Sequence, residues 1–293
     1  MKTLPLVGKR RSVAIKHTLL VLLLCAALGR AQTSPASLNG SLDVSRGDLN
    51  GVIGSTVAAS VSIPVGDKMG LQTDAFYTHV SNQDLVGLAA QYHWDFADGF
   101  RINSIVAEIE QKYFNASETG ISGSFRLTWF TITAATGLER FRFNENSLLS
   151  NSNKRSVFGT MAFTFYPSDK FAISLEGSQR FGNRFGVVKV EYQTPQPGLS
   201  IFAEAAKGQW GYNHTLFGLR YYFGARKRLN LRQQQDSDPY VLRNLFYAIG
   251  NYVADFNQHA AAHNGMPSNS YTGYYTLTPL GGPSLGPILP VSE

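Results

Sequence analysis

The sequence predicts an all-β fold: a closed, antiparallel, up-and-down transmembrane β-barrel of about 12 strands, followed by a short C-terminal helix and a disordered tail. Two observations carry this prediction. Between residues 39 and 224, the chain breaks into segments of nine to fourteen residues in which apolar residues alternate with polar or small ones. Only 16% of the 293 residues are charged, whereas a soluble domain usually carries about a quarter.

Residues 1–31 are expected to form a secretory signal peptide, cleaved after Ala31. They comprise a basic start through Lys16, an apolar run from Leu19 to Leu28 and small residues at the end. The apolar run is too short to cross a hydrocarbon core of about 30 Å as a helix. An uncleaved membrane anchor is therefore disfavoured.

The charge and cysteine content change once the signal peptide is removed. The single cysteine, Cys25, lies inside the signal, and Leu24 stands before it where a lipoprotein signal has a small residue. Lipidation is thus disfavoured, and the exported chain has no thiol for a disulfide. Subtracting the bases of the signal leaves a remainder without excess charge, so no nucleic-acid partner is expected.

The predicted barrel spans residues 39–224, after a linker at 32–38. Its strands are expected at 39–48, 52–64, 69–80, 84–95, 101–113, 119–129, 131–142, 155–166, 170–181, 184–193, 198–207 and 213–224. Several connections are compact, whereas the polar stretch from Asn144 to Lys154 is longer. Short turns on one side and longer loops on the other are typical of outer-membrane barrels, which places both ends of the barrel on the short-turn side.

Each predicted strand has one apolar face. In the last strand, Phe217, Leu219 and Tyr221 share one face, and Arg220 lies on the other. A soluble barrel or sandwich is the alternative, but its outer face would be expected to carry many Lys and Glu residues. The opposite rows are instead small and polar, so we expect the apolar rows to face lipid.

The same rule is applied to the strand at 101–113. Ile105, Ala107 and Ile109 form its apolar row and are expected to face lipid. Aromatic residues gather toward the strand ends, which suits the interfacial girdles of a membrane barrel. They are Tyr77, Tyr92, Trp94, Tyr113, Trp129, Phe130, Phe165, Tyr166, Tyr192, Tyr221 and Phe223.

The opposite rows contain the side chains expected to line the lumen. The candidates are Asp74, Glu108, Glu110, Arg126, Glu139, Glu176, Arg180, Lys189, Glu191, Glu204 and Arg220. Seven acids stand against four bases in this set. Such charges either pair across the tube and block it or line a water-filled path with a mild cation preference.

No constellation in the sequence supports catalysis, and no cofactor or metal is expected. His93 and His214 have no serine in a recognisable motif beside them. His259 and His263 would lie one turn apart on a helix, but no third ligand is near. The carboxylates of Glu108 and Glu110 could resemble an acid/base pair, yet lumen lining explains them without chemistry.

The segment after the last strand is expected to fold separately. Residues 225–238 read as a basic polar linker, 239–264 as an amphipathic helix and 265–293 as a disordered tail. The apolar stripe of the helix needs cover: it could lie along the inner leaflet, plug the periplasmic mouth or bind a partner. The stripe consists of Leu242, Leu245, Phe246, Ile249, Val253 and Phe256.

The end of the predicted barrel resembles a known group of proteins. The run Phe217-Gly-Leu-Arg-Tyr-Tyr-Phe-Gly224, followed by Lys227-Arg-Leu-Asn-Leu-Arg-Gln-Gln-Gln-Asp-Ser-Asp-Pro239, is similar to largely uncharacterised bacterial outer-membrane, porin-like barrels. The resemblance covers about residues 39–240 and implies recognition by the barrel assembly machinery. It brings no established activity. Such chains commonly stop soon after this point, whereas this one continues to Glu293.

Together these inferences predict a protein of a Gram-negative-type outer membrane, in contact with outer-membrane lipids, with its C-terminal tail in the periplasm. A porin-like or structural role is expected, including a narrow passive channel. The alternative is an envelope scaffold whose helix at 239–262 binds a periplasmic partner. A lipid-modifying enzyme is a more remote hypothesis.

Overall fold

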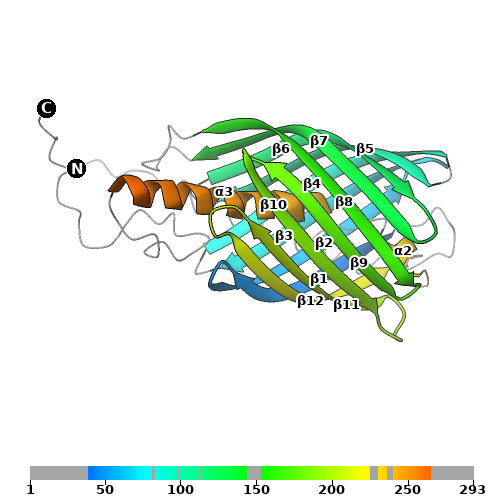
Figure 1. Cartoon of the computed structure of the whole chain (residues 1–293). Coiled ribbons are helices and arrows are strands. Elements are labelled where there is room, and N and C mark those ends of the chain that lie inside the picture. The colour runs from blue at the N-terminus through cyan, green and yellow to red at the C-terminus, as the bar shows by residue number, and fades with distance from the viewer. Residues whose placement is uncertain are drawn as a thin grey trace, which may run out of the picture.

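A computed structural model describes residues 39–80, 83–97, 99–112, 114–143, 153–224, 230–235 and 240–264. Twelve antiparallel strands form one closed barrel, as predicted (Figure 1). The strands are β1 (Asn39–Leu49), β2 (Val52–Pro64), β3 (Met69–Val80), β4 (Gln83–Ala97), β5 (Phe100–Gln111), β6 (Phe114–Arg126), β7 (Phe130–Phe143), β8 (Lys154–Ser168), β9 (Phe171–Arg180), β10 (Asn183–Gln193), β11 (Leu199–Gly208) and β12 (Asn213–Phe223).

The barrel closes where β1 pairs with β12, in a register that runs from Gly40 opposite Phe223 to Leu49 opposite His214. Closure satisfies the backbone groups of both terminal strands, as hydrocarbon requires. Two helices follow, α2 (Leu231–Gln234) and α3 (Tyr240–Asn264). Within the described residues, neither helix is both long and apolar enough to cross a bilayer.

The strand boundaries agree with the prediction to within two residues except in β6. This strand begins at Phe114, five residues earlier than expected. The Asn and Ser residues at its start read as a turn, but Phe114, Ala116 and Glu118 are buried at alternate positions. Strand periodicity therefore extends through the apparent turn signal. The predicted signal peptide at 1–31, the linker at 32–38 and the tail at 265–293 lie outside the described residues.

The barrel has two ends, which we name by the connections they carry. The terminal rim is the end at which β1 begins and β12 ends. The far rim carries the turns at 50–51, 181–182 and 209–212. Five of the six far-rim connections are only two to four residues long, and the one from 144 to 153 is ten. The expected contrast between short turns and long loops thus reduces to this single connection.

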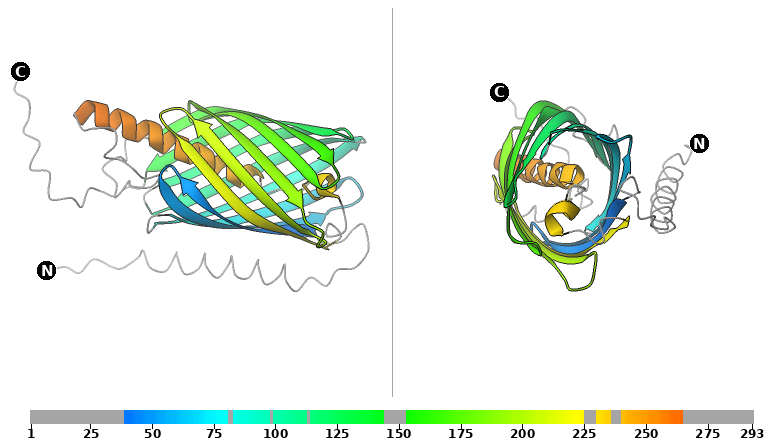
Figure 2. Two further views of the ribbon diagram at one scale, coloured as in Figure 1. Left: turned by 60° about the horizontal axis from the view of Figure 1, so that its bottom comes forward. Right: turned by 90° about the vertical axis from the view of Figure 1, so that its right-hand side faces the viewer.

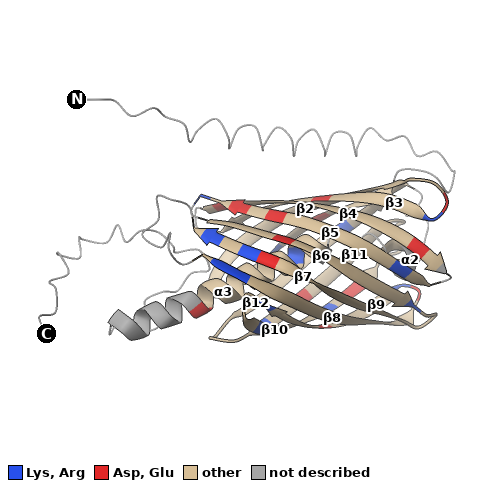
Figure 3. Ribbon diagram, turned by 90° about the horizontal axis from the view of Figure 1, so that it is seen from above, with Lys and Arg blue, Asp and Glu red and all other residues tan. Residues whose placement is uncertain are grey.

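The outer face carries a continuous set of exposed apolar side chains, illustrated by Leu138 and Phe217, which are 67% and 64% exposed. Figure 3 shows that most of the strand ribbon is uncharged. In water such a surface would be unfavourable, since apolar area is stabilised by leaving water. It suits contact with lipid, as predicted for the apolar rows.

Helix α3 lies inside the barrel rather than outside it (Figure 2). All side chains from Val241 to Ala254 are buried except that of Arg243, which is partly buried. The expectation that the apolar stripe of the helix needs cover is therefore met inside the barrel for this part of the helix. Of the three kinds of cover considered for the stripe, a plug comes nearest, but the helix fills the lumen itself rather than only the mouth of the barrel (Figure 2).

Candidate functional site: the barrel lumen

The lumen divides into two parts with different chemistry. The part nearer the terminal rim is a polar cavity, which we call the polar chamber. The part nearer the far rim is filled by α3 and by apolar side chains that point inward from the strands, which we call the apolar collar. The collar consists of Leu49, Phe76, Val80, Leu85, Ile105, Ile109, Phe114, Phe141, Phe181, Phe185, Tyr212 and Leu216.

The polar chamber has an empty volume of about 1150 Å³, which includes open solvent. Its wall is built mainly from hydroxyl, amide and charged side chains at the inward positions of β3 to β11, together with the first two turns of α3. Typical members are Gln91, Asn103, Ser122, Thr164 and Arg126. Because polar groups of this kind hold water well, the chamber is suited to solvent and small polar solutes.

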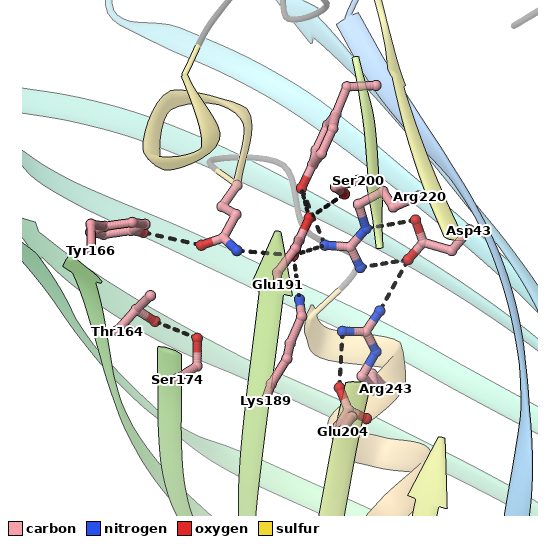
Figure 4. A network of polar contacts seen from close by, with 12 residues as sticks. Asp43, Thr164, Tyr166, Ser174, Lys189, Glu191, Ser200, Glu204, Arg220 and Arg243 are labelled. Carbon is pink, nitrogen blue, oxygen red and sulfur yellow. Dashed lines mark hydrogen bonds and ion pairs between the residues drawn. The ribbon is translucent and has the colours of Figure 1, made fainter. Parts of the chain in front are cut away.

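A network of ion pairs lies beside the chamber, centred on Arg220 (Figure 4). The Nε and Nη2 atoms of Arg220 donate to the two carboxylate oxygens of Asp43, at 2.7 and 2.5 Å. Its Nη1 donates to Glu191 at 3.3 Å. Lys189 Nζ also lies 3.2 Å from Glu191. These side chains are buried, so each charge depends on its partners.

Glu191 also binds groups at the terminal rim. It accepts hydrogen bonds from Ser200 Oγ at 2.7 Å and from Tyr222 Oη at 2.9 Å. Gln235, which directly follows α2, donates to Glu191 at 3.0 Å and accepts a hydrogen bond from Tyr166 Oη at 3.2 Å. The segment that leads to α3 is thus tied to the barrel wall.

Arg243 joins α3 to this network. Its Nη2 donates to Asp43 at 3.0 Å and its Nη1 to Glu204 at 3.3 Å. The strands alone supply three carboxylates and two cations to the network, and Arg243 is the third cation. The members are Asp43, Glu191, Glu204, Lys189, Arg220 and Arg243. The helix therefore balances the charge of this part of the wall.

The apolar collar surrounds the next turns of α3. Phe246 meets Phe76 of β3 edge to face, with ring centroids 5.6 Å apart. Tyr252 lies between Phe141 and Phe181, at centroid distances of 4.7 and 5.7 Å. Leu245 and Ile249 are fully buried in the same cluster. Fully burying each such side chain contributes about 1.5 to 3 kcal/mol.

The other side of α3 faces β10 to β12, where the wall leaves room for it. A Cβ atom on Gly208 would lie 2.6 Å from Asn251 Oδ1, so a larger residue there would displace the Asn251 side chain. Asn251 Nδ2 donates to the Arg184 carbonyl at 3.2 Å. Asn183 Nδ2 donates to Asp255 at 3.0 Å. Glycine at 208 thus permits close approach of strand and helix.

A second group of buried charges lies in the wall behind the collar. Arg180 forms an ion pair with Glu118 and stacks on the ring of Phe158 with its guanidinium carbon 4.3 Å from the ring centroid. Glu139 accepts hydrogen bonds from the Phe181 backbone N–H and from Ser156 Oγ. These contacts brace neighbouring strands and do not face the chamber, because none of the charged members lines it.

The structure places nine of the eleven predicted lumen residues at inward positions. Six of them belong to the two ionic groups described above. Asp74 is buried and accepts hydrogen bonds from Gln72 and Gln91, both at 2.9 Å. Glu176 and Arg126 line the polar chamber, as do Lys189 and Glu204.

Glu108 and Glu110 do not lie in the lumen. Both are exposed on the outer face, whereas Ile105 and Ile109 of the same strand point inward against α3. The prediction assumed that every polar row faces the lumen, but here the lumen is apolar because a helix fills it. The two carboxylates lie near the far rim, where charge on the lipid side costs only about 0 to 1 kcal/mol.

They are part of a set of charged or titratable side chains that ring the outer face near the far rim. We call this set the outer charged belt. Its members are Arg46, Asp48, His79, Asp84, Glu108, Glu110, Arg140, Arg142, Arg155, Arg184 and Lys207. On the outer face of the described strands, no comparable charges occur nearer the terminal rim. The belt therefore marks where the hydrocarbon band ends.

Other lumen residues were missed by the sequence analysis. Arg101 forms a bidentate pair with Asp95, at 2.7 and 2.9 Å, and was overlooked with the reversed face of β5. Glu118 was not predicted, because the strand expected at 119–129 excluded it, whereas β6 begins at Phe114. Asp43 could have been found, since it alternates with the outward Leu42 and Val44. Arg243 had no signal that placed it in the barrel.

The histidines considered for chemistry have structural surroundings. His214 is buried against the ring of Tyr247, with centroids 4.3 Å apart, and His93 lines the polar chamber. The side chains of His259 and His263 lie outside the described part of the chain. Among the described residues, no group of three or more potential ligands could hold a metal ion.

Comparison with known proteins yields matches of fold only. No protein-family model and no curated protein sequence matches the chain. The KdgM porin is 13% identical, covering 62% of this chain and 99% of its own, with a TM-score of 0.47. The NalP autotransporter translocator domain from Neisseria meningitidis is 14% identical, covering 73% and 98%, with a TM-score of 0.41. The Acinetobacter baumannii outer membrane protein Omp33 is 9% identical, covering 66% and 100%, with a TM-score of 0.39.

Proposed function

We propose that the protein is a porin-like outer-membrane barrel whose passage is closed by its own C-terminal helix. The observation that carries this proposal is the burial of α3 on all sides between Asn244 and Ala254. A helix buried all round leaves no continuous path for ions beside it. Without the helix, a tube of twelve strands would be wider than the side-chain-filled eight-stranded barrels.

The polar chamber supports the porin-like part of the proposal. It is a polar half-channel that ends at the collar, because the inward residues of β3, β5 and β7 become apolar there. A wall with hydroxyls and amides along half its depth would be unnecessary in a barrel that served only as a compact anchor. We infer that solutes pass when α3 moves out of the collar.

The charge of the wall predicts which ions an open barrel would prefer. Among the described strand residues, eight carboxylates and six cationic side chains point inward. The carboxylates are those of Asp43, Asp74, Asp95, Glu118, Glu139, Glu176, Glu191 and Glu204, and the cations are Arg101, Arg126, Lys154, Arg180, Lys189 and Arg220. A lumen with excess acid attracts cations. We therefore propose a mild cation preference for the barrel without α3.

The alternative functions receive less support. A scaffold that binds a periplasmic partner through the stripe of α3 would need that stripe to be accessible, but Leu242, Leu245 and Ile249 are buried in the collar cluster. A lipid-modifying enzyme would need a nucleophile and base in reach of the lipid. His214, the most buried of the histidines whose side chains the structure describes, faces the lumen instead.

The proposal is tested by conductance in planar lipid bilayers. The full-length protein is compared with a variant that lacks residues 239–293, and heat-modifiable gel migration confirms that both barrels are folded. We expect no steady conductance from the full-length protein and cation-selective steps from the truncated one. Equal conductance from both would show that α3 does not close the tube. A folded truncated barrel that stays silent would refute the porin-like function.

A further inference from the structure

The direction of α3 through the barrel determines where the end of the chain goes. The chain leaves β12 at the terminal rim, and α2 is held there by a hydrogen bond from the Leu231 N–H to the Asp169 carbonyl, at 2.9 Å, in the turn between β8 and β9. The chain therefore enters the lumen from the terminal rim, and the first residues of α3 lie beside the polar chamber.

The contacts of α3 then progress along the barrel in sequence order. Arg243 meets Asp43 and Glu204 beside the polar chamber. One turn later, Tyr247 packs on His214. Tyr252 reaches Phe181, in the turn between β9 and β10 at the far rim. The chain thus runs from the terminal rim at α2 to the far rim at Tyr252, and α3 does not turn back within its length.

The helix also continues beyond the wall. Asp255 is bound by Asn183, the first residue of β10, at the far rim, and α3 extends to Asn264. Nine further helical residues span about 14 Å at the helical rise. Figures 1 and 2 show this part of α3 projecting beyond the strands on the side opposite to α2. A helix that only closed the tube would have no need of this extension.

We propose a second function on these grounds. The barrel threads its own C-terminal segment across the membrane and presents it at the far rim, opposite the terminal rim. One feature assigns that side to the cell exterior, and a second agrees with it. The ten-residue connection at 144–153, the longest in the barrel, lies at the far rim, and outer-membrane barrels carry their longer loops outside. The outer charged belt lies at the same rim, where it meets polar headgroups rather than hydrocarbon.

This inference reverses the predicted periplasmic location of the tail. It does not depend on whether the barrel conducts, because a helix fixed in the lumen and a helix that moves would both emerge at the far rim. The 29 residues after Asn264 contain a single charged residue, Glu293. The presented segment is thus almost uncharged, in contrast to the belt from which it emerges.

The test uses single cysteines and a membrane-impermeant maleimide on intact cells of a Gram-negative expression host. Asn264→Cys is placed at the end of α3, Lys112→Cys in the far-rim turn between β5 and β6, and Asp67→Cys in the terminal-rim turn between β2 and β3. The parent chain, whose only cysteine is Cys25 of the predicted signal, gives the background. Heat-modifiable migration shows that each variant is folded.

We expect Asn264→Cys to be labelled on intact cells to the same extent as Lys112→Cys, and Asp67→Cys to be labelled only after the outer membrane is permeabilised. If Asn264→Cys behaves like Asp67→Cys, the helix does not cross the barrel and the inference is wrong. If Asn264→Cys and Lys112→Cys are both protected on intact cells, presentation at the cell surface is refuted.

Discussion

The polar chamber and the apolar collar occupy the same barrel and are built from the same strands, yet their inward residues differ in kind. Strand β5 shows the change within one row: Arg101 and Asn103 line the chamber, whereas Ile105 and Ile109 face α3. The row is governed by what lies against it, which is water at one end and a helix at the other. The inward side chains of a barrel are therefore not always polar, and their polarity depends on what fills the lumen beside them.

A charge placed in the collar should have the largest effect. Ile109→Asp would bury a carboxylate against α3 with no partner, which costs about 3 to 5 kcal/mol. We expect α3 to leave the lumen, so that protease cleaves it and conductance appears. Asn103→Asp is the matched control, on the same inward row of β5 but in the chamber. If both variants hold α3 equally well, the distinction between collar and chamber is wrong.

Removing the charge that links the helix to the chamber side should have a smaller effect. Arg243→Met leaves Asp43 and Glu204 with fewer donors, and we expect it to loosen α3 by about 2 kcal/mol. The measurement is the rate of proteolysis within α3 at graded urea concentrations. Arg243→Lys keeps the charge but not the two hydrogen-bonding arms of the guanidinium group. Its proteolysis rate should lie between those of the parent protein and Arg243→Met. A rate unchanged in Arg243→Met would mean that the collar alone holds the helix.

Changes in the outer charged belt should have the smallest effect. The double variant Glu108→Gln and Glu110→Gln removes two exposed charges, and such substitutions usually change stability by less than about 0.5 kcal/mol. We expect neither thermal unfolding nor ion selectivity to change. A shift in selectivity in the truncated barrel would indicate that these carboxylates act in the lumen after all.

The strands could be predicted from the sequence, because alternation with period two is a local signal. Contact with lipid requires an apolar row on one face of every strand, and this requirement produces the alternation. The faces could be assigned only where the lumen is polar, as in β12, where Arg220 points inward. In β5 both faces follow the same period, and nothing local tells whether Ile109 or Glu110 faces lipid. That choice depends on α3, more than 120 residues away along the chain.

The helix itself was predictable, but its location was not. The stripe from Leu242 to Phe256 indicates that an apolar face needs cover, and a stripe carries no information about which surface provides it. The matching signal is distributed over separate strands as single inward residues such as Phe76, Phe141 and Gly208. Only the closed barrel brings these residues together.

The most direct test of the central claim is a cross-link between α3 and the wall. Gly208→Cys combined with Asn251→Cys places two thiols at a point of close approach, whereas Gly186→Cys, on the outer face of β10, provides the control pair with Asn251→Cys. After oxidation, cleavage at Lys227 in the linker and denaturation, we expect the helix fragment to remain attached to the barrel only in the first pair, until a reductant is added. Release of the fragment from both pairs under oxidising conditions would contradict a helix seated in the lumen.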